Sequence, residues 1–242
     1  MLENINLENI LFLDIETVPQ CCNYDELEGP MKELWDKKAG SFRKDIVQET
    51  PADLYPRAGI YAEFGKIICI SVGFIRMENQ QTTLKIKSFY GDDEKKILSD
   101  FIGLLNTFYN RSESLLCAHN GKEFDFPYIA RRILINGLKI PFLLDLAGKK
   151  PWEVGLLDTM DLWRFGDYKS YTSLDLLATI FNIPTSKDDI DGSMVYKVYW
   201  EDKNLQRIVT YCQKDVIVIV QVLLKFKLKP LLADQNIYFS DL

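Results

Sequence analysis

Two carboxylates lie close together at the end of the first apolar segment of the sequence. Asp14 and Glu16 are part of, or directly follow, the apolar run NILFLDI at residues 9–15, which is typical of a buried strand. Side chains two residues apart on a strand point to the same face, so these two carboxylates converge. A second match to this spacing, at residues 92–94, lies in a hydrophilic turn before a helix, where acids commonly act as caps. The first pair is therefore the better candidate for a functional site.

Two further acids follow later in the chain. Asp125 lies in NGKEFD, shortly after the apolar segment at residues 115–118, where it could join a site or cap the helix that follows. Tyr211 and Asp215 are four residues apart and share one face of the last long helix, beside its apolar stripe. The alternative for this pair is a tyrosine packed at the core margin and an aspartate paired with a lysine such as Lys214.

Carboxylates in this number suit divalent cations and phosphodiester chemistry. Hard ions such as Mg²⁺ and Mn²⁺ take oxygen ligands, and two ions about 3.5–4 Å apart can stabilise the attacking and leaving oxygens during hydrolysis. We predict that one pair of ions is held by four acids that the fold brings together: Asp14, Glu16, Asp125 and Asp215. Tyr211 would orient water rather than act as a base, because the ordinary pKa of tyrosine is about 10.

The elements that must position these residues form an α/β pattern. The predicted strands cover residues 9–15, 66–75, 84–90 and 115–118. The predicted helices cover residues 93–109, 128–138, 173–183 and 204–227, with caps at Asp92 or Asp93 and at Thr172 or Ser173. Three strands, a helix, a strand and a helix in this order favour a mixed sheet flanked by helices. Residues 20–64 interrupt the pattern with mixed charge and aromatic residues, which indicates a helical insertion.

Length and composition favour a single domain over residues 1–242. The chain has 242 residues, of which 47% are hydrophobic, enough for one sizeable α/β core. Its formal net charge is −6, and the +4 of two divalent ions would bring it to −2, so the acidic total does not exclude a nucleic-acid substrate. The acidic first residues do not resemble a secretory signal, and no apolar run approaches the roughly 18 residues of a spanning helix. We therefore expect a cytoplasmic protein without a membrane segment.

Three segments together resemble the DEDD superfamily of 3′-to-5′ exonucleases. FLDIET at residues 12–17, NGKEFDFPY at 120–128 and YCQKD at 211–215 are similar to its three motifs, in the family's order. Their residues are most similar to those of the proofreading exonuclease domain of family B DNA polymerases. A tyrosine four positions before the last acid is typical of the tyrosine branch, DEDDy, since the histidine branch would need histidine where this chain has Thr210. The resemblance implies an α/β, ribonuclease-H-like fold with a mixed five-stranded sheet flanked by helices.

The resemblance also implies a reaction. It is the removal of nucleotides from the 3′ end of single-stranded DNA, with release of nucleoside 5′-monophosphates, by two ions of Mg²⁺ or Mn²⁺ that Asp14 bridges. Thr17 and Asn120 match positions near the terminal nucleotide, and Phe124 would offer a face to a base or pack in the core. We interpret His119 as a strand-end residue near the site rather than a catalytic one.

Two alternatives use the same fold: an exoribonuclease that trims RNA 3′ ends, and a catalytically silent nucleic-acid-binding protein. Since nothing resembling a polymerase active site follows the three motifs, we expect a free-standing relative, with a polymerase or repair factor as a partner in trans. The insertion at 20–64 and the loop at 186–193 lie outside the motifs and receive no role from the family.

Overall fold

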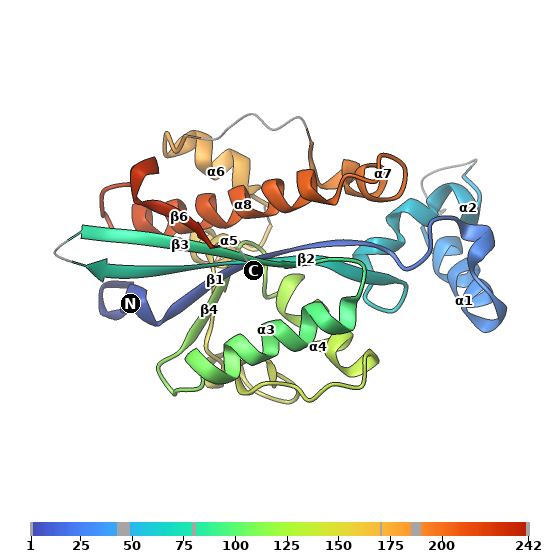
Figure 1. Cartoon of the computed structure of the whole chain (residues 1–242), viewed down its shortest axis with the longest axis horizontal. Helices are drawn as coiled ribbons and strands as arrows, with labels where there is room; N and C mark the ends of the chain where they lie inside the picture. The colour runs from blue at the N-terminus through green and yellow to red at the C-terminus, as the bar shows by residue number, and fades with distance from the viewer. Residues whose placement is uncertain (1, 43–48, 79–80, 170, 185–189, 241–242) are drawn as a thin grey trace.

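A mixed six-stranded sheet forms the centre of the computed structural model, which describes residues 2–42, 49–78, 81–169, 171–184 and 190–240 (Figure 1). The strands are β1 (Ile10–Pro19), β2 (Gly65–Glu78), β3 (Gln81–Tyr90), β4 (Leu115–Ala118), β5 (Leu156–Asp158) and β6 (Ile237–Ser240). Their order across the sheet is β5-β4-β1-β2-β3-β6. β1 pairs antiparallel with β2 and parallel with β4, so the strand that carries Asp14 and Glu16 is interior to the sheet.

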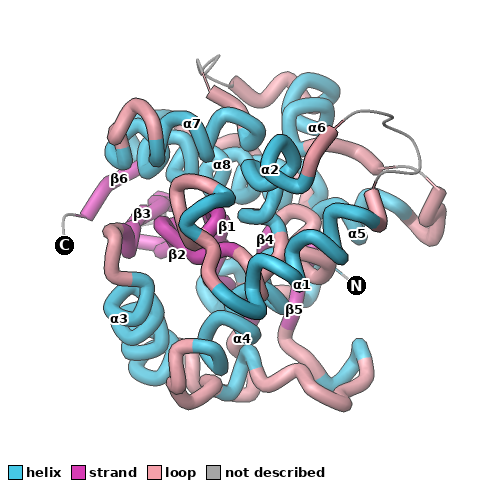
Figure 2. The backbone as a smooth tube through the Cα atoms, turned by 90° about the vertical axis from the view of Figure 1, so that its right-hand side faces the viewer, coloured by secondary structure: helices cyan, strands magenta, loops and turns pink. Residues whose placement is uncertain are grey.

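Helices cover both faces of this sheet. α6, α7 and α8 lie above the strands in Figure 1, and α3 and α4 lie below them; the view along the sheet in Figure 2 shows the same two layers. The helices are α1 (Gly29–Gly40), α2 (Pro51–Leu54), α3 (Glu94–Phe108), α4 (Asp125–Ile135), α5 (Thr159–Arg164), α6 (Leu174–Ile180), α7 (Val195–Trp200) and α8 (Leu205–Phe226). Within the described ranges, no helix has the length and apolar content to cross a bilayer.

Alternation along β1 decides which layer receives each side chain. Leu11, Leu13 and Ile15 belong to the core cluster that includes residues of α3 and α4. Ile10 and Phe12 belong to the opposite cluster, which includes residues of α8. Because the side-chain period of a strand is two, the even-numbered residues of β1 face α8.

The predicted mixed α/β fold is confirmed, but the sheet has one strand more than the five expected. All four strands located in the sequence are present, at or slightly beyond their predicted ranges. β5 and β6 were not located, because segments of three and four residues are too short to show a period. Pairing defines them instead: β5 lies beside β4, and β6 runs parallel to β3 along residues Leu84–Lys87.

The second group of acids, at residues 92–94, has structural roles. Asp93 caps α3, as predicted, by accepting a hydrogen bond from the Lys96 backbone N–H. Asp92 accepts the Tyr199 hydroxyl at 2.5 Å. Glu94 is buried and pairs with Arg132 of α4. The polar turn therefore joins α3 to its neighbours.

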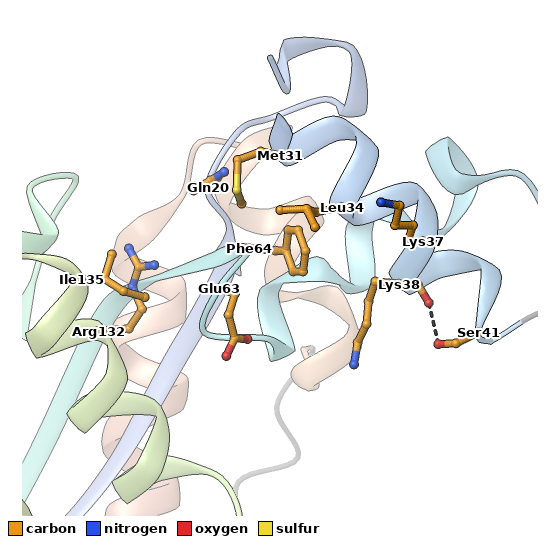
Figure 3. A pocket seen from close by; sticks show the side chains of 10 residues that line it. All are labelled: Gln20, Met31, Leu34, Lys37, Lys38, Ser41, Glu63, Phe64, Arg132 and Ile135. Carbon is orange, nitrogen blue, oxygen red and sulfur yellow. Dashed lines mark hydrogen bonds between the residues drawn. The ribbon is translucent and has the colours of Figure 1, made fainter. Parts of the chain in front are cut away.

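Residues 20–64, expected to be a helical insertion, contain α1, α2 and two 3₁₀ segments around a separate apolar cluster centred on Trp35. Residues 43–48 of this stretch, and residues 185–189 at the loop expected at 186–193, lie outside the described residues. Between α1 and α4 is a groove of about 780 Å³ (Figure 3). Met31, Leu34, Phe64 and Ile135 give it an apolar lining, and Arg132 lies in its wall.

The Glu94–Arg132 pair is the centre of a buried polar network. Arg132 donates to both carboxylate oxygens of Glu94, at 2.8 and 2.5 Å, and to the carbonyl of Ala62. Glu94 also accepts the backbone N–H of Ile67 and the Asn136 side-chain amide. One carboxylate thus joins α3, α4 and β2, and Arg132 extends the network to the end of the insertion.

We predict that Arg132→Met lowers the free energy of unfolding by about 3–5 kcal/mol, because it leaves the Glu94 charge buried without its partner. Lys96→Met is the matched control, since it removes one side of the exposed Lys96–Asp100 pair and should change stability by about 1 kcal/mol or less. Urea unfolding of both variants measures the difference. Equal losses of unfolding free energy in the two variants would show that the buried pair stabilises the fold no more than the exposed pair does.

Candidate active site

Four carboxylates from three separate segments come together on the α8 side of the sheet. Asp14 and Glu16 extend from β1, Asp125 is the first residue of α4, and Asp215 lies on α8. Electrostatic repulsion from Asp215 and Asp125 raises the pKa of both Asp14 and Glu16, although burial is the largest cause of the two shifts. Such coupling requires short separations, so the structure brings the predicted acids into one site.

The site is buried and only partly neutralised by hydrogen bonds. Glu16 and Asp125 are 7% and 3% exposed. Asp14 Oδ2 is buried and has no hydrogen-bond partner within the described part of the chain. Ionising several such carboxylates without a counter-charge is unfavourable, since burial and mutual repulsion both oppose it.

Asp125 is held against β1 by a hydrogen bond. Its Oδ1 accepts the backbone N–H of Ile15 at 3.2 Å, between the two acids of the strand. The recorded pairs of β1 with β4 end at Phe12, so the Ile15 N–H lies beyond the paired part of this strand edge. The Asp125 carboxylate thus accepts a hydrogen bond from a backbone N–H of β1 that lies beyond the residues paired with β4. Capping α4 was the structural alternative for Asp125, and this bond gives it a role outside its own helix.

Asp158 supports the loop before Asp125 and was not singled out from the sequence. It is 2% exposed, accepts the backbone N–H groups of Asn120 and Lys122 at 3.0 Å each, and caps α5. Asn120 adopts a left-handed conformation, with φ of 59°, which asparagine tolerates better than most residues. The sequence signal was an acid at the end of a short apolar segment, LLD, just before a helix.

His119 lies beside the site with both ring nitrogens engaged. Nδ1 is 2.9 Å from Thr159 Oγ1, and Nε2 is 2.9 Å from the carbonyl oxygen of Thr172. Burial lowers the pKa of the imidazole, which favours the neutral ring. These contacts join the end of β4 to α5 and to the segment before α6, and they agree with the interpretation of His119 as a strand-end residue.

Tyr211 points toward the acids from α8. Burial and the charges of Asp215, Glu16 and Asp14 raise the pKa of its phenol far above the ordinary value, and its hydroxyl is hydrogen-bonded to Asp215. The phenol therefore keeps its proton at neutral pH. It can donate a hydrogen bond, but it cannot serve as a base.

The three residues expected to contact substrate lie around the same acids. Thr17 follows an irregularity in the β1–β2 register between Glu16 and Thr17, and it is hydrogen-bonded to Tyr128. Phe124 immediately precedes Asp125 and is half-buried, with its ring centroid 5.3 Å from that of Tyr128. The side-chain oxygen of Asn120 is buried and has no hydrogen-bond partner among the described residues.

Two other side chains near the acids were not predicted to belong to the site. Cys212 is fully buried on α8, and its thiol, with one oxygen each of Asp14 and Glu16, forms a group whose atoms lie within 4.8 Å of one another. Tyr171, in the segment before α6, is exposed, yet its pKa is raised by partial burial and by the charges of Asp125 and Asp158. Cys212 is three residues before Asp215 on α8, so helical spacing could have related it to that acid. Only the fold brings Tyr171 close to the acids.

The donor set fits divalent cations. Four carboxylates provide the hard oxygen ligands that Mg²⁺ and Mn²⁺ prefer, and Asp14 Oδ2 is a buried acceptor without a donor. Positive charge at this place would reverse the repulsion that raises the pKa values of Asp14 and Glu16. The residues present therefore suit a metal centre better than a site for an anion alone.

Most of the chain matches a family of known proteins. A family model described as "Predicted 3'-5' exonuclease related to the exonuclease domain of PolB" matches residues 60–238, more than half of the chain. The match includes Asp125, Tyr211 and Asp215, whereas Asp14 and Glu16 lie before it. The DNA polymerase of Archaeoglobus fulgidus is 25% identical to this chain in an alignment of 134 positions that covers 52% of this chain and 16% of that polymerase.

A solved structure shows the same fold. The family B DNA polymerase from the hyperthermophilic archaeon Pyrobaculum calidifontis matches with a TM-score of 0.54 over 90% of this chain, at 17% sequence identity. The matched region is 24% of that polymerase chain, so this chain spans about a quarter of its length or less.

We predict that Asp125→Asn stabilises the metal-free protein at pH 8. Burial, followed by Asp158 and Asp215, raises the pKa of Asp125 to about 7, whereas the unfolded chain releases this proton near pH ~4. Stability from this group is present below pH ~4 and is lost as the pH rises to 7, at about 1.4 kcal/mol per unit of pKa shift. The advantage of the variant should therefore shrink toward pH 5.

Urea unfolding in EDTA across this pH range measures the effect. Asp100→Asn, at an exposed position of α3, is the control and should behave like the wild type. A constant difference between Asp125→Asn and the wild type at all pH values would contradict the raised pKa.

Proposed function

Because the chain belongs to the family of predicted 3′-to-5′ exonucleases related to the exonuclease domain of PolB, we propose that it hydrolyses phosphodiester bonds from the 3′ end of single-stranded DNA by a two-metal-ion mechanism. The observation that carries the proposal is the gathering of Asp14, Glu16, Asp125 and Asp215 in one buried place. Four carboxylates of like charge repel one another, so their gathering in one place favours a cationic ligand.

The four acids would hold the two ions, and Asp14 would be a ligand of each. Bound Mg²⁺ or Mn²⁺ supplies charge stabilisation to the attacking and leaving oxygens and lowers the pKa of water. The chain itself contributes position: β1 fixes Asp14 and Glu16 two residues apart on one face, and the bond from Ile15 N–H fixes Asp125 between them. The products would be nucleoside 5′-monophosphates.

Tyr211 would orient the attacking water. A phenol that retains its proton donates a hydrogen bond to an oxygen, and the raised pKa of Tyr211 keeps it in this form at neutral pH. Loss of the hydroxyl should therefore weaken the reaction without removing the charges that hold the ions.

The terminal nucleotide would lie among Thr17, Asn120 and Phe124. The partnerless Asn120 oxygen offers an acceptor for a hydroxyl group. The half-buried Phe124 ring can present its open side to a base while its other side packs on Tyr128. A polymerase or repair factor acting in trans would supply the 3′ ends.

Matched DNA and RNA strands, each labelled at the 5′ or the 3′ end, test the reaction. With Mg²⁺ or Mn²⁺, the 5′-labelled DNA should shorten in single-nucleotide steps and the 3′-labelled DNA should release labelled mononucleotide at once. EDTA should stop both. Faster shortening of RNA would favour the exoribonuclease alternative, and binding without any metal-dependent shortening would favour a catalytically silent protein.

We predict that Asp215→Asn reduces the rate of shortening by about 10³-fold or more, since it removes a charge from the metal-binding set. Tyr211→Phe should leave a measurable remainder, within about 100-fold of the wild-type rate. Single-turnover rates of the purified variants compare the two, with Asp100→Asn as a control for an exposed aspartate. Equal, mild losses in both variants would mean that this helix is not part of the site.

A further inference from the structure

The segment between α5 and α6 exposes three aromatic side chains close to the candidate active site. Phe165, Tyr168 and Tyr171 are 91%, 72% and 66% exposed. By contrast, Trp163 two residues earlier is directed inward and stacks on Phe226, with ring centroids 6.1 Å apart. Several exposed aromatic rings in one short segment are a feature of binding surfaces. We call these three residues the aromatic lip.

The backbone of the segment holds Phe165 in a strained conformation. Phe165 has φ of 46°, in the left-handed region, and Gly166 follows with φ of 90°. This region is unfavourable for a bulky residue compared with ordinary backbone regions. The turn is closed by the Asp167 N–H, which donates to the Arg164 carbonyl at 2.8 Å. The Phe165 ring is almost fully exposed, so packing of this side chain does not offset the strain.

Polar contacts attach this segment to the loop that precedes Asp125. Arg164 donates to Glu123 at 3.1 Å, and its guanidinium lies 5.7 Å from the centroid of the Tyr168 ring. At the other end, the carbonyl oxygen of Thr172, the residue after Tyr171, lies 2.9 Å from Nε2 of His119 beside the site. The charge of Asp125 also raises the pKa of Tyr171, after partial burial. The lip thus extends from the candidate catalytic acids along the loop of Glu123.

We propose that the aromatic lip is a stacking platform for the unpaired bases that precede the 3′-terminal nucleotide of a single-stranded nucleic acid. The inference rests on the proposed function and extends it beyond the terminal nucleotide. Exposed rings bind bases of any sequence by stacking, each contact being worth several-fold to more than a hundredfold in affinity. In a duplex the base faces are covered by their neighbours, so the platform selects unpaired strands.

The chemistry of the segment favours this occupant over an apolar protein surface. The aromatic rings are accompanied by the exposed cationic side chain of Lys169, a combination suited to bases joined by phosphates, whereas the charge of Arg164 is already paired with Glu123. The contact between Thr172 and His119 places the Tyr171 end of the platform nearer the acids, where the terminal phosphodiester would be cleaved.

The test compares three variants: Phe165→Ala with Tyr168→Ala and Tyr171→Ala combined, Tyr168→Phe with Tyr171→Phe combined, and Phe108→Ala. Phe108 is a control because it is 66% exposed at the end of α3. Fluorescence anisotropy measures binding of short single-stranded DNA, single-stranded RNA and blunt duplex DNA in Ca²⁺. Shortening assays in Mg²⁺ give KM and kcat. Thermal unfolding confirms that these exposed substitutions leave the fold intact.

The triple alanine variant should bind single strands about 10- to 100-fold more weakly and raise KM by a similar factor. The phenylalanine pair should bind like the wild type, because the rings are retained. The p-nitrophenyl ester of thymidine 5′-monophosphate has no preceding base. On this substrate the triple alanine variant should lose at least about tenfold less activity than it loses on a strand. The binding measurements with single-stranded RNA and single-stranded DNA show which of the two is preferred.

Unchanged strand binding in the triple alanine variant would overturn the inference, as would equal losses on the strand and on the ester. These results leave the proposed function standing if the wild type shortens strands. Conversely, a wild type that binds strands but never shortens them would refute the proposed reaction, whereas weaker binding by the triple alanine variant would still support the platform.

Discussion

Repulsion among buried carboxylates is the constraint that the rest of the structure must satisfy. Burial is the largest cause of the raised pKa values of Asp14, Glu16 and Asp125, and repulsion from neighbouring carboxylates, including Asp215, adds to it. Left to themselves, such groups would move apart into water. Rigid neighbours prevent this: β1 is interior to the sheet, and core clusters on both faces fix its side chains. A protein that maintains such a concentration of negative charge is prepared for a cationic ligand.

The supports of the site are short-range and polar. β4 ends before it can pair with the middle of β1, and Asp125 accepts the backbone donor that lies beyond. Asp158 orders the loop that leads to Asp125, and His119 joins that loop to the segments around Thr159 and Thr172. A small displacement of any of these groups would move Asp125 relative to β1, so precision in the site depends on residues that need not touch a substrate.

The sequence predicted what depends on local periodicity. The convergence of Asp14 and Glu16 follows from the two-residue repeat of a strand, and the shared face of Tyr211 and Asp215 follows from the helical repeat. β6, Asp158 and Tyr171 were missed for one common reason: their positions arise from contacts between distant segments. β6 is defined by pairing with β3, and Asp158 ends β5, which is defined by pairing with β4. Tyr171 approaches the acids through a loop whose course no local pattern specifies.

The groove beside α1 has a mechanical connection to the acids. Arg132 lies in its wall, and Asp125 is the first residue of the same helix, α4, which spans Asp125–Ile135. A helix of this length is a stiff rod of about 16 Å, so tilting one end shifts the other. Through Glu94, the same arginine also engages α3 and β2. A ligand that fills or widens the groove would therefore tilt α4 and shift Asp125 at its N-terminal end.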